Sequence, residues 1–88
     1  LPDQVIYYQA TQALNEQQDY PTAITKFRTL LDHNPQSEYA DKCRYYLALC
    51  LIKTGKPDEA IEYLNQIKND EFRFFKPLSD LGIEFESN

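Results

Sequence analysis

One pattern of hydrophobic and polar positions occurs twice along the chain. Residues 19–35 (DYPTAITKFRTLLDHNP) and 56–68 (KPDEAIEYLNQIK) each combine a turn, an Ala-Ile pair and apolar residues at helical spacing. The matched pairs, Ala23-Ile24 and Ala60-Ile61, are 37 residues apart. A period of this size is typical of stacked helix-turn-helix units, because one such unit cannot bury its apolar face alone. The pattern therefore predicts an all-α chain built from repeated helical hairpins.

The first two predicted helices form one such hairpin. We expect Asp3 to cap the first helix, residues 4–17, because a carboxylate at an N-cap accepts hydrogen bonds from free N–H groups. The second helix opens at Asp19 and ends at Asn34-Pro35, since asparagine tolerates a left-handed conformation and proline cannot continue a helix. The first helix has a partial apolar stripe, Val5, Tyr8, Ala10, Ala13 and Leu14. The predicted buried side of the second helix is Ala23, Ile24, Phe27, Leu30 and Leu31.

The third predicted helix, residues 38–54, is the longest and most apolar element. Ser37 precedes it as an expected N-cap, and Gly55 supplies its end. Leu49 and Ile52 widen its apolar surface beyond a single stripe, so we expect this helix to pack on two sides. Its main apolar side consists of Tyr39, Ala40, Cys43, Tyr46, Leu47, Cys50 and Leu51.

The fourth predicted helix begins at Pro57, which suits a first helical position, and runs to about Lys68. Its expected buried side is formed by Ala60, Ile61, Leu64 and Ile67. The remaining stretch is apolar but irregular, and we expect a turn and a short helix there.

The charge balance of the chain disfavours some classes of partner. The 88 residues are enough for one small domain, and they include 14 acidic and 9 basic residues, for a net charge of -5. Such a chain repels phosphate backbones and anionic membranes, so nucleic acid is an unfavourable partner. No apolar run reaches the roughly 18 residues that a membrane span needs. Since the chain contains no methionine, we expect it to be a processed or excised piece.

The residues with chemical reactivity do not assemble into a catalytic or metal site. Cys43 and Cys50 are seven residues apart in one predicted helix, about 10.5 Å at 1.5 Å per residue, which is too far for a disulfide. We interpret them as small buried fillers. His33 is the only histidine, and no nucleophile with a paired base and no glycine-rich phosphate loop occurs. We therefore expect no enzyme activity, no cofactor and no metal.

Two sets of residues resemble one repeat family. The first set is Tyr7, Leu14, Ala23, Phe27 and Pro35, and the second is Leu47, Ala48, Leu51, Gly55, Ala60, Leu64 and Ile67. Together they resemble the tetratricopeptide repeat (TPR) family. The resemblance implies a short right-handed α-solenoid in a single domain, residues 1–88. It would have repeat one at about 4–36, repeat two at about 37–70 and a capping or tail segment at about 71–88.

The connection at residues 34–41 carries three residues more than the usual 34-residue repeat. This resembles the longer repeats of bacterial envelope proteins in the family, which include outer-membrane assembly lipoproteins and periplasmic factors of the Tol system. The resemblance favours a bacterial cell envelope, with the cytoplasm as the alternative.

In this family the first helix of each repeat lines a concave face. Carried over, this implies a partner-binding face formed by Tyr8, Gln12, Asn15, Lys42, Tyr45, Leu49 and Ile52. Lys42 is the only cation among them, which disfavours the family's clamp for a terminal carboxylate. An extended or helical partner segment with apolar anchors fits better. Most of the seven tyrosines are nevertheless expected to pack in the core, with Tyr8 and Tyr45 as the favoured exceptions.

Two functions remain open. The first is a non-catalytic adaptor or scaffold that binds a peptide or helix of a partner protein in the concave face. The alternative is a structural module that forms homo-oligomers through an apolar C-terminal end, with Phe72, Phe74 and Phe75 as the self-association residues.

Overall fold

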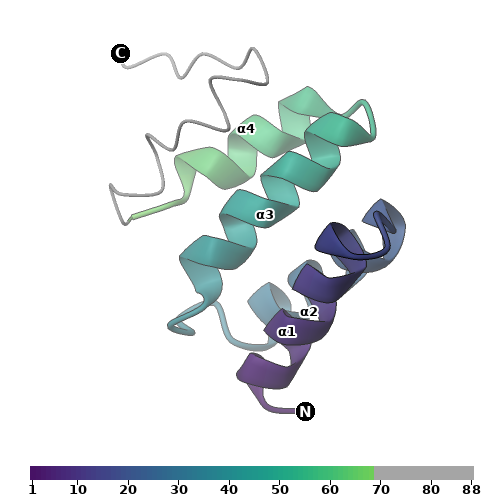
Figure 1. Cartoon of the computed structure of the whole chain (residues 1–88). Coiled ribbons are helices and arrows are strands. Elements are labelled where there is room, and N and C mark those ends of the chain that lie inside the picture. The colour runs from purple at the N-terminus through teal and green to yellow at the C-terminus, as the bar shows by residue number, and fades with distance from the viewer. Residues whose placement is uncertain (69–88) are drawn as a thin grey trace.

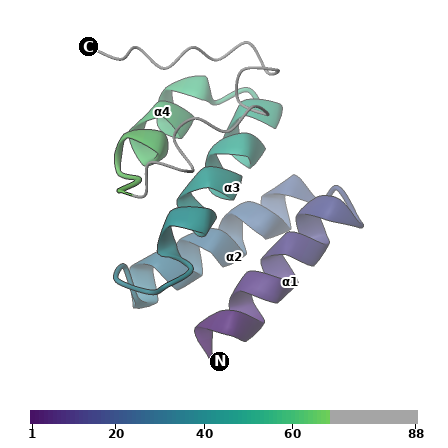
Figure 2. The ribbon, with the colours of Figure 1, turned by 60° about the vertical axis from the view of Figure 1, so that its left-hand side comes forward.

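The computed structural model describes residues 1–68, which form four α-helices and no strand. They are α1 (Asp3–Asn15), α2 (Tyr20–His33), α3 (Ala40–Lys53) and α4 (Pro57–Asn65). Consecutive helices run antiparallel, and each packs against the next, so that α3 lies between the α1–α2 hairpin and α4 (Figures 1 and 2). The predicted all-α stack of helical hairpins is confirmed, as is the packing of α3 on two sides.

Two of the predicted helix boundaries are confirmed by their local geometry. The Asp19 side chain caps α2 by accepting hydrogen bonds from the Thr22 backbone N–H at 3.2 Å and from the Thr22 hydroxyl at 2.7 Å. Gly55 follows α3 with φ of +82°, a conformation that glycine adopts without steric cost. These two residues fix where the first turn of α2 begins and where the chain leaves α3.

Other predictions about the helix ends were wrong in whole or in part. Asp3 is the first residue of α1 rather than its cap, and its Oδ2 accepts a hydrogen bond from Asn34 Nδ2 at 2.9 Å. The helix α2 ends at Asn34 as predicted, but Asn34 has φ of -146° and not a left-handed conformation. Ser37 lies before α3 and accepts from the Tyr39 N–H at 3.1 Å, so that α3 begins only at Ala40. These polar side chains tie the connection between α2 and α3 together instead of capping helices. The helices α1 and α4 end two and about three residues before the predicted positions.

The core contains small residues where helices approach closely and large residues between them. Ala10, Ala23, Ala48 and Ala60 are fully buried, and so is Phe27, a large residue of the same core. The remaining buried residues are Ile6, Ala13, Leu30, Leu31, Ala40, Cys43, Tyr45, Leu47, Cys50, Leu51, Leu64 and Ile67.

Three residues of the predicted apolar stripes lie at the surface. Val5 and Tyr8 are 36% and 60% exposed, and Ile61 of α4 is 44% exposed. In α1 the predicted Ala10 and Ala13 do face the core, together with Ile6, which the predicted stripe did not include. Neighbouring residues are about 100° apart around a helix, so Val5 and Ile6 point in different directions, and periodicity alone selected the wrong one of these two.

Candidate protein-binding face

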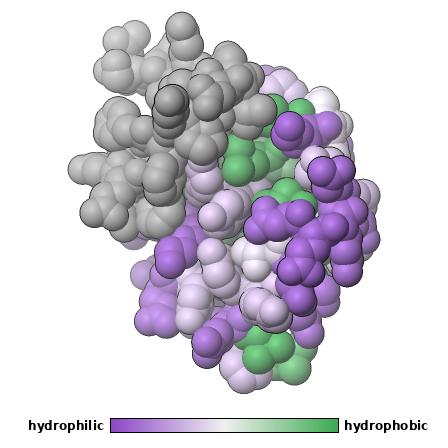
Figure 3. Space-filling view, viewed as in Figure 1, coloured by the Kyte–Doolittle hydropathy of each residue, from purple (hydrophilic) through white to green (hydrophobic). Residues whose placement is uncertain are grey.

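The helices α1 and α3 contact each other as well as α2. We call the predicted partner-binding residues on these two helices the α1/α3 face. Of the residues predicted for this face, Tyr8, Asn15 and Lys42 are exposed, while Gln12, Leu49 and Ile52 are partly exposed. Gln12 Nε2 donates a hydrogen bond to the Tyr8 hydroxyl at 3.3 Å, so these two side chains lie together. Figure 3 shows hydrophobic side chains reaching the surface over α3 and, separately, near the start of α1.

Tyr45 was predicted to lie on this face, and that prediction is wrong. Its side chain is only 3% exposed and packs edge-on against Tyr46, with ring centroids 5.4 Å apart and an interplanar angle of 73°. Burial raises the pKa of Tyr45 to about 12. Because α3 packs against both α2 and α4, few of its positions stay accessible. Tyr45 is therefore a packing residue and not a surface contact.

Aromatic rings hold α1, α2 and α3 together. Tyr7 of α1 stacks on Tyr39 with centroids 5.0 Å apart at 26° and meets Phe27 edge-on at 6.5 Å. Phe27 of α2 stacks on Tyr46 of α3 at 6.1 Å and 17°. Burial raises the pKa of Tyr7 to about 12, which places this hydroxyl in a poorly solvated setting. The tyrosines of this cluster pack between helices, as expected, but Tyr7, Tyr39 and Tyr46 stay partly exposed.

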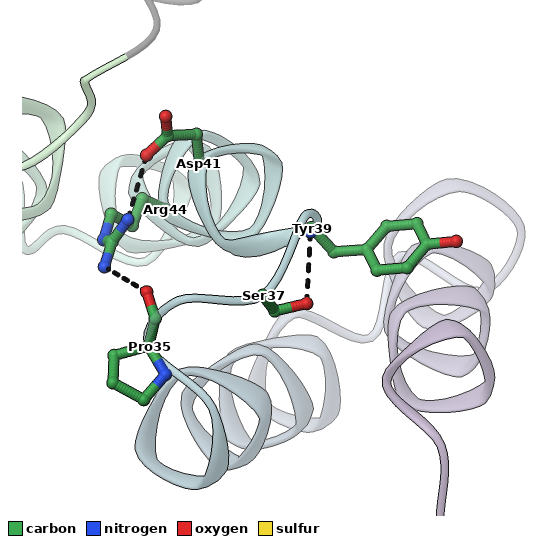
Figure 4. A network of polar contacts seen from close by, with 5 residues as sticks. All are labelled: Pro35, Ser37, Tyr39, Asp41 and Arg44. Carbon is green, nitrogen blue, oxygen red and sulfur yellow. Dashed lines mark hydrogen bonds and ion pairs between the residues drawn. The ribbon is translucent and has the colours of Figure 1, made fainter.

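A shallow hollow opens beside the aromatic cluster, at the start of α1. Its volume is about 410 Å³, and we call it the tyrosine hollow; it is lined by Gln4, Val5, Tyr7, Tyr8 and Tyr39. The Tyr39 ring extends from the residue before α3 toward α1 (Figure 4). Sequence reasoning placed Val5 and Tyr39 in the core and so missed this hollow. The signal that could have found it is the Val5, Tyr8, Gln12 and Asn15 stripe, which continues the predicted face by one turn.

A second, polar hollow of about 300 Å³ lies along the connection from Pro35 to Lys42 and reaches Arg44 and Lys68. Arg44 Nη1 forms an ion pair with Asp41 at 2.9 Å, and Arg44 Nη2 donates to the Pro35 carbonyl at 3.2 Å (Figure 4). These bonds fasten the connection to the first turn of α3. The arginine therefore has a structural role at this position.

The match of the chain to known families decides its classification. A sequence model described as the tetratricopeptide repeat matches residues 14–73, which is more than half of the chain. The chain belongs to the tetratricopeptide repeat family. Comparisons with curated proteins and with solved structures gave no match. TPR repeats generally mediate protein–protein interactions and are typically non-catalytic.

The two cysteine side chains of this TPR chain lie in its core. Cys43 and Cys50 are both buried, and burial raises the pKa of their thiols to about 12 and about 11. Thiols of this kind stay protonated at neutral pH and are poor nucleophiles. Within residues 1–68 no group of three side chains is placed to hold a metal ion, and none of the four helices is long and apolar enough to cross a membrane.

Some predictions concern residues beyond position 68, or the setting and assembly of the chain. Phe72, Phe74 and Phe75, the turn and short helix expected beyond the fourth helix, and the tail segment 71–88 lie outside the described residues. The boundary between the repeats, the bacterial cell envelope setting and the oligomeric state stay predictions.

Proposed function

We propose that this TPR chain is an adaptor or scaffold module that docks an extended or helical segment of a partner protein on its α1/α3 face. The observation that carries the proposal is the exposure of a large aromatic side chain on α1: Tyr8 is 60% exposed and stands beside the partly exposed Gln12. Aromatic residues are enriched where partners bind, because they bury much area at a small cost in side-chain entropy. Leu49 and Ile52 add partly exposed apolar area on α3.

The charge of the face supports a protein segment over other partners. The chain has a net charge of -5, and Lys42 is the only cation among the residues of the proposed face. The face is therefore unfavourable for nucleic acid. Its mixture of apolar, amide and tyrosine side chains suits a peptide with apolar anchors and a few hydrogen bonds.

The proposal is tested with a peptide selected from a random 16-residue phage library against the whole chain. The dissociation constant of the selected peptide is measured by calorimetry for the parent chain, for Tyr8→Ala and for Lys42→Ala. Both changes lie at exposed positions and leave the core intact. We expect Tyr8→Ala to weaken binding at least tenfold, the effect of removing an aromatic anchor.

The control is Ile61→Ala, which removes an exposed apolar side chain from α4; Ile61 is 44% exposed, against 60% for Tyr8. This variant is expected to bind the selected peptide like the parent chain. If Ile61→Ala weakens binding and Tyr8→Ala does not, the partner docks on another face and the proposal fails.

A further inference from the structure

The tyrosine hollow is a preformed part of the α1/α3 face. Tyr7 is fixed between Tyr39, stacked at 5.0 Å, and Phe27, which meets it edge-on at 6.5 Å. Tyr8 stands beside them, with its hydroxyl held by Gln12. Three tyrosines with limited freedom therefore meet at one accessible place, and a ligand there orders few side chains.

Two carboxylates are next to lining residues in the sequence: Asp3 precedes Gln4, and Glu38, which lines the polar hollow, precedes Tyr39. Burial raises the pKa of Tyr39 first, and the charge and hydrogen bonding of Glu38 and the charge of Asp3 raise it further. Hydrogen bonds from Ser37 and Asn34 lower the pKa of Asp3, so this side chain is ionised at neutral pH. The charged groups that act on Asp3 are His33 and the amino group of Leu1.

The lining of the hollow contains no positive side chain: it consists of glutamine, valine and three tyrosines. The faces of tyrosine rings attract cations through their electron density, and arginine does so best because its planar guanidinium also stacks. The two carboxylates add a partner for its N–H groups. An acidic side chain would meet the same carboxylates and be repelled.

We propose that the tyrosine hollow receives a cationic side chain, arginine in preference to lysine, of the partner segment that docks on the α1/α3 face. This inference rests on the proposed function. It specifies the chemistry of one anchoring side chain of the partner. The guanidinium of this side chain lies over Tyr8 and Tyr39, with Glu38 and Asp3 beside it. The partner segment is then apolar where it meets Leu49 and Ile52 and basic where it meets the start of α1.

The test is an NMR titration of the whole ¹⁵N-labelled chain with the pentapeptide acetyl-Gly-Leu-Arg-Leu-Gly-amide. Peptides with glutamine or glutamate in place of arginine serve as the comparison. We expect saturable shifts at Val5, Tyr8 and Tyr39 with the arginine peptide. The glutamine peptide should bind at least threefold more weakly, and the glutamate peptide should cause no shift at these residues.

Two variants separate the ring from the charge. Tyr8→Leu keeps an apolar side chain and removes the ring, and Glu38→Gln removes one carboxylate without changing its size. Each variant should bind the arginine peptide at least threefold more weakly than the parent chain and bind the glutamine peptide with unchanged affinity. Ile61→Ala is the control and should bind both peptides like the parent chain.

Equal binding of the glutamate and arginine peptides, or shifts confined to residues outside the hollow, would overturn the inference. The proposed function has its own readout, the effect of Tyr8→Ala on the selected peptide. If Tyr8→Ala weakens binding of the selected peptide but the arginine peptide causes no NMR shifts at the hollow, only the inference of a cationic anchor is wrong. If Tyr8→Ala also leaves binding of the selected peptide unchanged, the proposed docking face is wrong.

Discussion

At the scale of single residues, the side chains divide between packing and surface in a way that spacing alone did not resolve. Tyr8 and Tyr45 were both predicted to be exposed, and only Tyr8 is. Tyr45 belongs to a helix with neighbours on two sides, and its ring packs against Tyr46. The sequence shows that tyrosines recur, but burial depends on which helices lie alongside, and that is information about tertiary structure.

Phe27 is the residue whose loss should cost the most stability. It is fully buried and contacts the rings of Tyr7 and Tyr46. Truncation of a buried phenylalanine to alanine costs about 3–5 kcal/mol, a large part of the stability of a small domain. We expect Phe27→Ala to lower the urea midpoint drastically, with Phe27→Leu intermediate between it and the parent chain. Equal midpoints for the three chains would contradict the packing described above.

Because of the two buried thiols, the free energy of unfolding should depend on pH in the alkaline range. Burial raises the pKa of Cys43 to about 12 and that of Cys50 to about 11, from an ordinary value of 9.0. Because the folded pKa lies above the unfolded one, the contribution to stability is complete below pH 9 and is lost as the pH rises toward 11 and 12. The free energy of unfolding in urea should therefore fall between pH 9 and pH 11.

The matched chain for this pH experiment is Cys43→Ala/Cys50→Ala, which should show a smaller fall over the same range. Tyrosines such as Tyr7, whose pKa burial raises to about 12, account for the remainder. A parent chain whose unfolding free energy stays constant to pH 11 would show that these thiols are solvated.

At the scale of the helices, the predicted helix ends were correct where a single residue determines the local geometry. Asp19 and Gly55 act as expected, because an N-cap carboxylate and a left-handed glycine are local devices. Asp3 and Ser37 instead take partners across the chain or in the connection before α3, while Asn34 ends α2 as predicted and its side chain bonds Asp3. Whether such a polar side chain caps its own helix or bonds a residue distant in the sequence depends on how α1 packs against α2. A local sequence pattern carries no information about that packing.

The Asp19 cap gives a prediction for α2. Thr22 supplies both of its hydrogen bonds and lowers the pKa of Asp19, so the cap is formed at neutral pH and is lost as the pH falls. Asp19→Ala should lower the free energy of unfolding at pH 7, because the Thr22 N–H loses its acceptor. The control is Asp32→Ala, an exposed residue near the other end of α2, which should be close to neutral. Equal losses for the two variants would rule out a specific capping role.

At the scale of the whole molecule, the repeated pattern predicted the architecture, and the family match confirmed it. The paired positions differ in burial: Ala23 and Ala60 are both fully buried, whereas Ile24 is partly buried and Ile61 is largely exposed. The helix α2 packs extensively against both α1 and α3, while α4 packs extensively against α3. A repeat pattern predicts which residues are equivalent, but the neighbours of each helix decide how deeply equivalent residues are buried.

The central claim is that a partner segment docks on the α1/α3 face. The most direct test attaches a nitroxide spin label to the peptide selected from the phage library and measures the loss of NMR signal intensity along the chain. The account predicts strong losses at Tyr8, Gln12 and Lys42, with Ile61 little affected. Losses centred on Ile61 and α4, with α1 unaffected, would contradict it.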